Sequence, residues 1–395
     1  MVSTQHRFSP ARREEERVTP LELFFDLVFV LAITQCSALM AEDPTWPGLA
    51  KGLVVLGVIW WGWVGYSWLT SAIDPEEGAV RLAMFAAMAG FAVVALCVPQ
   101  AFGDLGLTFA LAYGAVRAAH IALFVLASRD DGGLRRSVTG LGISTAVSIG
   151  ILVAASTTDG VAQGALWAVA LTLDMGGPLV IDPSGWRLEA AHFAERHGLV
   201  VIIALGESII ALGALAGRDV DGGTLFAAVV GIGLSVALWW LYFDVISYVA
   251  GRVLVETVEV RRRNTLARDA YSLLHFPLIA GIVLTAVGLH EVLVHPDEPL
   301  ELETATALYG GTALYLLAHA AFYGRCTGRL KPHRLAVGLL LAAAIPLGTE
   351  LDALVSQVVI TATLTALLVY ESIRFRESRL QVRRELAHGH TPPAG

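Results

Sequence analysis

The stretch Leu21-Glu-Leu-Phe-Phe-Asp-Leu-Val-Phe-Val-Leu-Ala-Ile-Thr-Gln35 decides the fold class of this chain. It is apolar enough to cross a bilayer, yet it contains Glu22 and Asp26 one helical turn apart. Residues at i and i+4 lie on one face of a helix. A carboxylate near the bilayer centre costs about 2.5–3.5 kcal/mol, so it normally faces protein or water. The sequence therefore predicts a spanning first helix with a stripe of two acids.

The composition of the whole chain is that of an integral membrane protein. Of 395 residues, 55% are hydrophobic and 16% are charged, whereas soluble proteins are about 45–50% apolar and about 25% charged. The mean hydropathy is +0.65, and the apolar excess runs the whole length, which excludes a soluble enzyme with one membrane anchor. We therefore expect the lipid bilayer and a small solute or ion as partners.

Other partners and cofactors are not indicated. The basic residues are spread over many short loops, so there is no nucleic-acid footprint. The three cysteines, Cys36, Cys97 and Cys326, are too scattered for a disulfide framework or a structural zinc site. We expect no cofactor, and the sequence leaves open whether the chain forms a homo-oligomer.

Apolar windows predict an all-α fold of about 12 transmembrane helices, since a span needs about 20 mostly apolar residues. The windows are 21–40, 49–70, 79–98, 105–127, 138–156, 161–181, 197–216, 225–250, 272–290, 304–324, 333–349 and 353–371.

The distribution of positive charge supports this number of spans. Loops on one side, counted from the N-terminus, receive 24 of the 27 Lys and Arg residues, Arg196 and Arg334 among them. The other side receives Lys51 and Arg218, and Arg117 lies within a span. Because positive loops stay inside, both termini are predicted to be cytoplasmic.

The two halves resemble each other in order, which predicts a duplicated six-helix unit. Four pairs match: Glu22 with Glu195, Trp60-Trp61 with Trp239-Trp240, Ala89-Gly90 with Ala280-Gly281, and His120 with His319. An even number of crossings makes the copies parallel. The predicted organisation is a cytoplasmic N-terminal segment (1–20), a first repeat (21–181), a connector (182–191), a second repeat (192–371) and a cytoplasmic tail (372–395).

Ionisable residues inside the spans are the candidate functional groups, as an ion, proton or substrate path. They are Glu22, Asp26, His120, Asp174, Glu207, Asp244, His275 and His319, with Arg117 as a partner charge. The structural alternative is that these groups pair within each bundle and fix helix packing. Glu207 is the strongest single candidate, because no basic residue lies near it in sequence and burial favours its neutral, protonated form.

Two further patterns have structural and functional interpretations. His192 and Glu195 lie at i and i+3, the spacing of two metal ligands on a helix, but a polar helix entrance is the stronger interpretation and we predict no metal. The aromatic run from Trp60 to Trp68 fits either a packed interface or the wall of a cavity.

The first-helix stretch, together with Ala191-His-Phe-Ala-Glu-Arg-His-Gly-Leu-Val-Val-Ile-Ile-Ala-Leu-Gly-Glu-Ser-Ile209, resembles the bacterial low temperature requirement A family over nearly the whole chain. The resemblance implies a multi-pass protein of the bacterial inner membrane. Phe25-Asp-x-x-Phe29-x-x-Ala-Ile-Thr34 is also similar to the first-helix signature of the lysosomal potassium-channel family, which has two six-helix repeats. This chain departs from that signature in having Phe25 instead of Ser and in lacking the Phe-Asp pair in its second repeat.

Three functions remain open at this point. The leading hypothesis is a transporter or channel for a small solute or cation, with proton coupling through the intramembrane acids as one form of it. The second is a membrane-embedded enzyme acting on a lipid or peptide, although no zinc-protease motif, nucleophile elbow or phosphate loop is present. The third is a stress-related membrane scaffold without turnover.

A flux measurement on Glu207→Gln tests the leading hypothesis. If Glu207 titrates on the path, proton or cation flux into liposomes holding the purified protein should disappear in the variant, because the amide cannot release a proton. Wild-type protein in matched liposomes is the control. Equal flux in the two proteins would remove Glu207 from the path.

Overall fold

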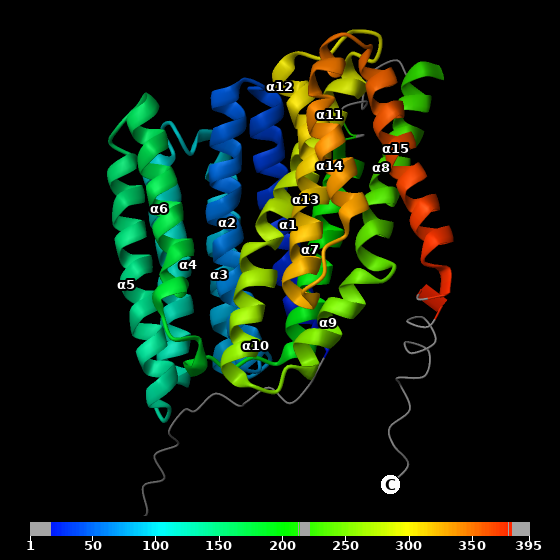
Figure 1. The fold of residues 1–395 in the computed structure, drawn as a ribbon. Coiled ribbons are helices and arrows are strands. Elements are labelled where there is room, and N and C mark those ends of the chain that lie inside the picture. Colours follow the sequence, from blue (N-terminus) through cyan, green and yellow to red (C-terminus); the bar gives the residue numbers. More distant parts are fainter. Residues whose placement is uncertain (1–16, 212, 214–221, 378, 381–395) are drawn as a thin grey trace, which may run out of the picture. The chain divides into compact units, whose positions relative to one another are not determined.

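The computed structural model describes residues 17–211, 213, 222–377 and 379–380 (Figure 1). Several predictions concern positions outside these described residues. They include the side of the membrane assigned to six basic residues, Arg7, Arg12, Arg13, Arg218, Arg383 and Arg384. They also include most of the N-terminal segment (1–20), the end of the window 197–216 and most of the tail (372–395).

The chain divides into two compact units. The first consists of residues 1–200 and 254–276, and the second of residues 201–253 and 277–395. This division follows packing and does not test the predicted duplication, which stays a prediction.

The first unit contains six long helices, the start of a seventh and a short segment from later in the chain. In order these are α1 (Pro20–Glu42), α2 (Trp46–Ala72), α3 (Gly78–Cys97), the 3₁₀ turn η1 (Val98–Gln100), α4 (Gly106–Ala127), α5 (Gly132–Ala155), α6 (Gly160–Val180), the 3₁₀ turn η2 (Pro183–Gly185), the first half of α7 (Ala190–Ile210), α10 (Val260–Leu266) and the π-helix η4 (Ala267–Leu273).

The second unit is also helical. Its elements are the end of α7, α8 (Gly222–Phe243), α9 (Ile246–Glu256, to residue 253), α11 (His275–Val294, from residue 277), α12 (Leu302–Ala305), the π-helix η5 (Thr306–Gly310), α13 (Gly311–Thr327), α14 (Pro332–Ala343), the 3₁₀ turn η6 (Ile345–Thr349) and α15 (Ala353–Arg374).

The helical class of the prediction is confirmed, and each predicted window contains one of these helices. Within the described residues, eight helical stretches are long and apolar enough to cross a membrane. The helices of four predicted windows, α6, α7, α13 and α14, are not among these eight stretches, and α14 is too short with 12 residues. The predicted window 225–250 is interrupted at Asp244, between α8 and α9. A polytopic helical membrane protein is established, whereas twelve spans and their orientation remain predictions.

Local sequence explains where α1 begins. Thr19 is the N-cap, Pro20 occupies the first helical position, and Glu22 is the third residue. The Glu22 carboxylate accepts the Thr19 backbone N–H at 2.9 Å, and the Thr19 hydroxyl accepts the Glu22 N–H at 3.4 Å. This is a capping box, which satisfies two backbone donors that the first turn leaves open. Glu22 thus has a structural role at the start of the helix.

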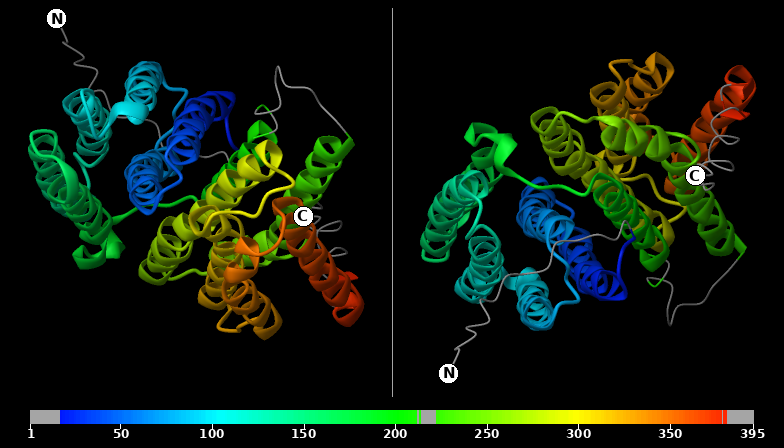
Figure 2. Two further views of the ribbon diagram at one scale, coloured as in Figure 1. Left: turned by 90° about the horizontal axis from the view of Figure 1, so that it is seen from above. Right: turned by 90° about the horizontal axis from the view of Figure 1, so that it is seen from below.

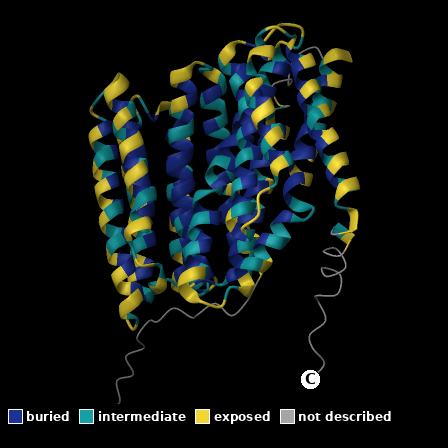
Figure 3. Cartoon of the chain, in the orientation of Figure 1, coloured by how far each residue is buried: buried dark blue, intermediate teal, exposed yellow. Residues whose placement is uncertain are grey.

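The helices of the first unit differ in how much of their surface is buried. Almost the whole of α2 is buried, including Trp60, Trp63 and Tyr66. In contrast, α1 exposes Leu23 and Leu27, and α5 exposes further apolar side chains. Figure 3 shows such exposed residues along the outer helices, and Figure 2 shows α5 and α6 next to each other at the edge of this unit. Large exposed apolar side chains on long helices are suited to contact with lipid.

In the second unit, α11 approaches the η5–α13 helix so closely that backbone meets backbone. A Cβ atom on Gly281 would lie 2.6 Å from the Tyr315 nitrogen and 2.7 Å from the Gly311 oxygen, and one on Gly288 would lie 2.5 Å from the Leu308 Cβ. Small residues permit this approach, which is how many membrane helices associate.

Gly281→Ala should therefore destabilise the protein by about 1–3 kcal/mol, the usual cost of overpacking, because the new methyl group meets backbone atoms that cannot turn away. Gly150→Ala on α5 is the matched control, since nothing lies within 4 Å of its Cβ position. Thermal unfolding in detergent measures both, and an unchanged melting temperature for Gly281→Ala would contradict the close packing.

Candidate functional site

The two acids of the first helix lie in a buried ionic cluster, which we call the α1–α7 cluster: Glu22, Asp26, His192 and Arg196. All four side chains are at most 2% exposed. Arg196 of α7 forms an ion pair with Asp26 and lies 3.5 Å from Glu22 Oε1. It also donates a hydrogen bond to the Thr70 hydroxyl of α2 at 2.9 Å. One guanidinium therefore links three helices.

His192 completes the α1–α7 cluster. Its Nε2 lies 2.9 Å from Glu22 Oε1, and its Nδ1 lies 3.0 Å from the Ser71 hydroxyl. Asp26 in turn accepts a hydrogen bond from the Trp63 indole at 2.8 Å. The cluster lies where α1 and α7 begin and α2 ends, within the first two turns of α1 and α7.

Counting charges shows what this cluster can do. Among these four side chains, two carboxylates face one permanent cation, since Arg stays protonated in proteins, so the acids outnumber the arginine by one. Buried charges must be paired or neutralised. One proton, held by His192 or by Glu22 across their 2.9 Å contact, makes the cluster neutral. The arrangement places a titratable imidazole against a buried carboxylate, and this is the geometry on which the function proposed below is based.

More imidazoles lie beside this cluster. The His197 ring packs edge-on to Trp63 at 5.0 Å between centroids and to His275 at 5.3 Å. His197 Nδ1 lies 2.8 Å from the Phe193 carbonyl, and His275 Nδ1 lies 3.0 Å from the Ala270 carbonyl in the π-helix. Both residues are fully buried. His275 thus joins the same end of the first unit as Glu22 and Asp26.

A second buried pair lies deeper in the first unit. Arg117 of α4 contacts Asp174 of α6 at 3.1 Å, and the Thr145 hydroxyl of α5 bonds to both at 2.7 and 2.9 Å. The Tyr113 hydroxyl donates to Asp174 at 3.2 Å. These contacts satisfy the carboxylate fully, so Asp174 is held rather than presented to a solute.

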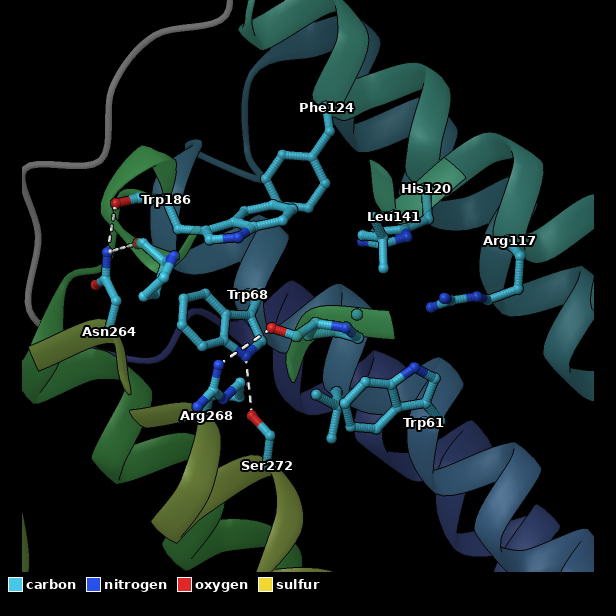
Figure 4. A pocket seen from close by; sticks show the side chains of 14 residues that line it. Trp61, Trp68, Arg117, His120, Phe124, Leu141, Trp186, Asn264, Arg268 and Ser272 are labelled. Carbon is cyan, nitrogen blue, oxygen red and sulfur yellow. Dashed lines mark hydrogen bonds between the residues drawn. The ribbon is translucent and has the colours of Figure 1, made fainter. Parts of the chain in front are cut away.

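His120 stands one turn from Arg117 and faces a cavity of about 50 Å³ within the first unit (Figure 4). Neither of its ring nitrogens has a hydrogen-bond partner of good geometry among the described residues. The walls and mouth are lined by Trp61, Trp68, Phe124, Trp186, Asn264, Arg268 and Ser272. The aromatic run of α2 therefore serves both predicted purposes, since Trp60 and Trp63 are packed while Trp61 and Trp68 line the cavity.

The remaining predicted residues lie in the second unit. His319 of α13 has Nδ1 2.9 Å from Arg334 Nη1, and Arg334 forms a two-pronged pair with Glu371 of α15 at 2.6 Å. Asp244 forms an ion pair with Arg379. Glu207 is buried in α7, 2% exposed. The structure thus does not bring the eight predicted residues together into one site.

The two residues considered for a metal are separated. His192 is buried against Glu22, whereas Glu195 is exposed and accepts a hydrogen bond from the Val18 N–H at 3.3 Å. Across the part of the chain that the structure describes, no three His, Cys, Asp or Glu side chains are placed to hold a metal ion.

Sequence reasoning missed Arg196, Arg334 and Glu371. The charge count assigns the first two to loops on the cytoplasmic side, which is wrong, because Arg196 lies in α7 and Arg334 in α14 and both are buried. A signal existed for Arg196, which is four residues after His192 and so shares its helix face. Thr19-Pro20-Leu-Glu22 was likewise readable as a capping box.

Comparison with known proteins gives the family. Residues 17–369 match the family described as "Bacterial low temperature requirement A protein (LtrA)". The chain is also 30% identical over 335 residues to the "Uncharacterized protein RA0937" of Rhizobium meliloti (strain 1021), covering 82% of this chain and 81% of that one. No solved structure matches. The long apolar helices and this match over most of the chain make it a multi-pass membrane protein that belongs to the bacterial low temperature requirement A family.

Proposed function

We propose that this protein is a carrier in the bacterial inner membrane that moves a small solute together with protons. The observation on which the proposal rests is the α1–α7 cluster, in which two buried carboxylates share one arginine and the remaining charge faces His192 at 2.9 Å. A group that is neutral only with one proton is a proton-binding site. Intramembrane acids and histidines of this kind form the relays of pumps and transporters.

The burial of the cluster favours a carrier over an open channel. All four side chains are at most 2% exposed, so water does not reach them in this conformation. An ion pore with acidic walls would instead keep its carboxylates hydrated. Alternating exposure of a closed centre is the behaviour of a carrier.

The cavity beside His120 is the proposed entry point of the solute. At about 50 Å³ it is smaller than small-molecule pockets, which measure about 300–1,000 Å³, so the proposal requires it to widen in another conformation of the carrier. Helix α2 connects it to the proton centre, because Trp63, Thr70 and Ser71 contact the cluster while Trp61 and Trp68 line the cavity. Its charged lining groups, Arg117 and Arg268, are ion-paired with Asp174 and Asp269, and aromatic rings surround them. N–H donors among aromatic walls suit a small solute that has a hydrogen-bond-accepting end and an apolar body, rather than a bare cation.

Similar triads in the two units support a duplicated architecture. In the first, His120 of α4 lies beside Arg117, whose partner Asp174 is on the sixth helix. In the second, His319 of α13 lies beside Arg334 of α14, whose partner Glu371 is on α15.

Two members of these triads have similar spacing and the third does not. Glu371 follows Asp174 by 197 residues and His319 follows His120 by 199, whereas Arg334 follows Arg117 by 217 and lies on a separate helix from His319. Two parallel six-helix repeats with both termini in the cytoplasm remain our proposal for the architecture.

Glu22→Gln tests the proton centre by flux. In liposomes with an imposed potassium diffusion potential and no solute, a pH-sensitive dye inside should report the uncoupled proton leak of the carrier with the wild type and only the protein-free rate with the variant. Glutamine keeps the oxygen that caps Thr19, so the helix should still form. Glu195→Gln, the same change on the exposed side of α7, should retain the flux, and loss of flux in both variants would argue against a role for the cluster.

Infrared difference spectroscopy tests proton binding without any solute. A pH titration of the wild type should show a carboxylic acid band or an imidazolium band from the α1–α7 cluster, because the cluster gains one proton as the pH falls. Whichever band appears should change in Glu22→Gln and in His192→Gln and should be unchanged in Glu195→Gln. Identical spectra for all four proteins would show that the cluster does not titrate.

A further inference from the structure

A separate pocket of about 600 Å³ lies wholly within the second unit. It is formed by the end of α8, the start of α9, the loop before α14 and the end of α15. Its size is in the range of pockets that hold small molecules, about 300–1,000 Å³. No residue of the proposed proton centre lines it.

The charges around this pocket do not cancel. Seven of its lining groups are charged, and four of them form two ion pairs, Arg334 with Glu371 and Arg379 with Asp244. Three cations remain, Arg329, Lys331 and Arg374, and none of them forms a salt bridge with a carboxylate of the described residues. His333 also faces the pocket, 2.7 Å from Glu371. The rim therefore has an excess of three positive charges.

The lysine is already held in position. Lys331 Nζ lies 4.8 Å from the centroid of the Tyr323 ring and 5.6 Å from that of Phe375. Burial lowers the pKa of Lys331, and the neighbouring Arg334 lowers it further. An anion bound in the pocket would stabilise the charged ammonium of Lys331 and so raise its pKa again.

The same pocket is open to the apolar surface of the protein. Trp240 and Tyr370 line it and are 40% and 49% exposed, and Leu330 at its edge is 63% exposed. On α15, Ile373 beside it is also exposed. Positive charge above an aromatic and aliphatic surface matches an amphiphile with an anionic head.

We infer that this pocket binds the phosphodiester headgroup of an anionic phospholipid, with the acyl chains along the exposed faces of α8 and α15. Arg329, Lys331 and Arg374 contact the phosphate, and Trp240 and Tyr370 contact the glycerol and upper acyl region. A phospholipid fits better than a free phosphate ion, because the apolar side chains of the lining make favourable contacts with acyl chains and none with a small hydrated anion.

Native mass spectrometry of the full chain in detergent tests this inference. One or a few molecules of phosphatidylglycerol should stay bound to each protein, and phosphatidylcholine should bind much more weakly. The triple variant Arg329→Gln, Lys331→Gln and Arg374→Gln should reduce phosphatidylglycerol affinity by at least about tenfold, since each basic residue contributes to anionic-lipid attraction. The control triple Arg135→Gln, Arg136→Gln and Arg262→Gln removes the same charge from exposed positions elsewhere and should leave binding unchanged.

The single variant Arg374→Gln guards against misfolding, because Arg374 is exposed, and it should weaken binding by a few fold. Equal loss in the control triple, or equal affinity for phosphatidylcholine, would overturn the proposal. Displacement of phosphatidylglycerol by inorganic phosphate would also overturn it, since it would show a site for a small anion.

Discussion

The ion pair of Arg196 with Asp26 is the interaction on which the first unit depends. A buried charge without a partner is very unfavourable, and removing one member of a buried pair costs about 3–5 kcal/mol. Arg196 comes from α7, Asp26 from α1, and the Thr70 hydroxyl that also accepts from Arg196 comes from α2. The three helices must therefore meet at this point whenever the charges are buried.

The same requirement makes the cluster suited to function. A purely structural pair would be complete with one acid, but Glu22 adds a second carboxylate and His192 a titratable base. The capping box explains one oxygen of Glu22, through its bonds to Thr19. The other oxygen contacts His192, a contact that helix capping does not need. Helix capping and the contact with His192 therefore use different atoms of one side chain.

Predicting this arrangement from sequence succeeded for individual helices and partly for the site. Apolar windows located every long helix, because hydropathy is a local property of the chain. The intramembrane acids were recognisable as exceptional for the same reason. Their partners were not, since Arg196 and Arg334 stand near helix ends, where a basic residue usually belongs to a loop.

The sequence by itself determined that this protein is a helical membrane protein with acids in its spans, because 20-residue apolar stretches have one stable form in a bilayer. Only the tertiary structure decided which charges neutralise one another. Arg117 meets Asp174 57 residues away, and Arg196 meets Asp26 170 residues away. Such pairings depend on which helices become neighbours, which local patterns do not specify. Packing thus decided that Glu22 and Asp26 lie in a buried ionic cluster with Arg196 and His192.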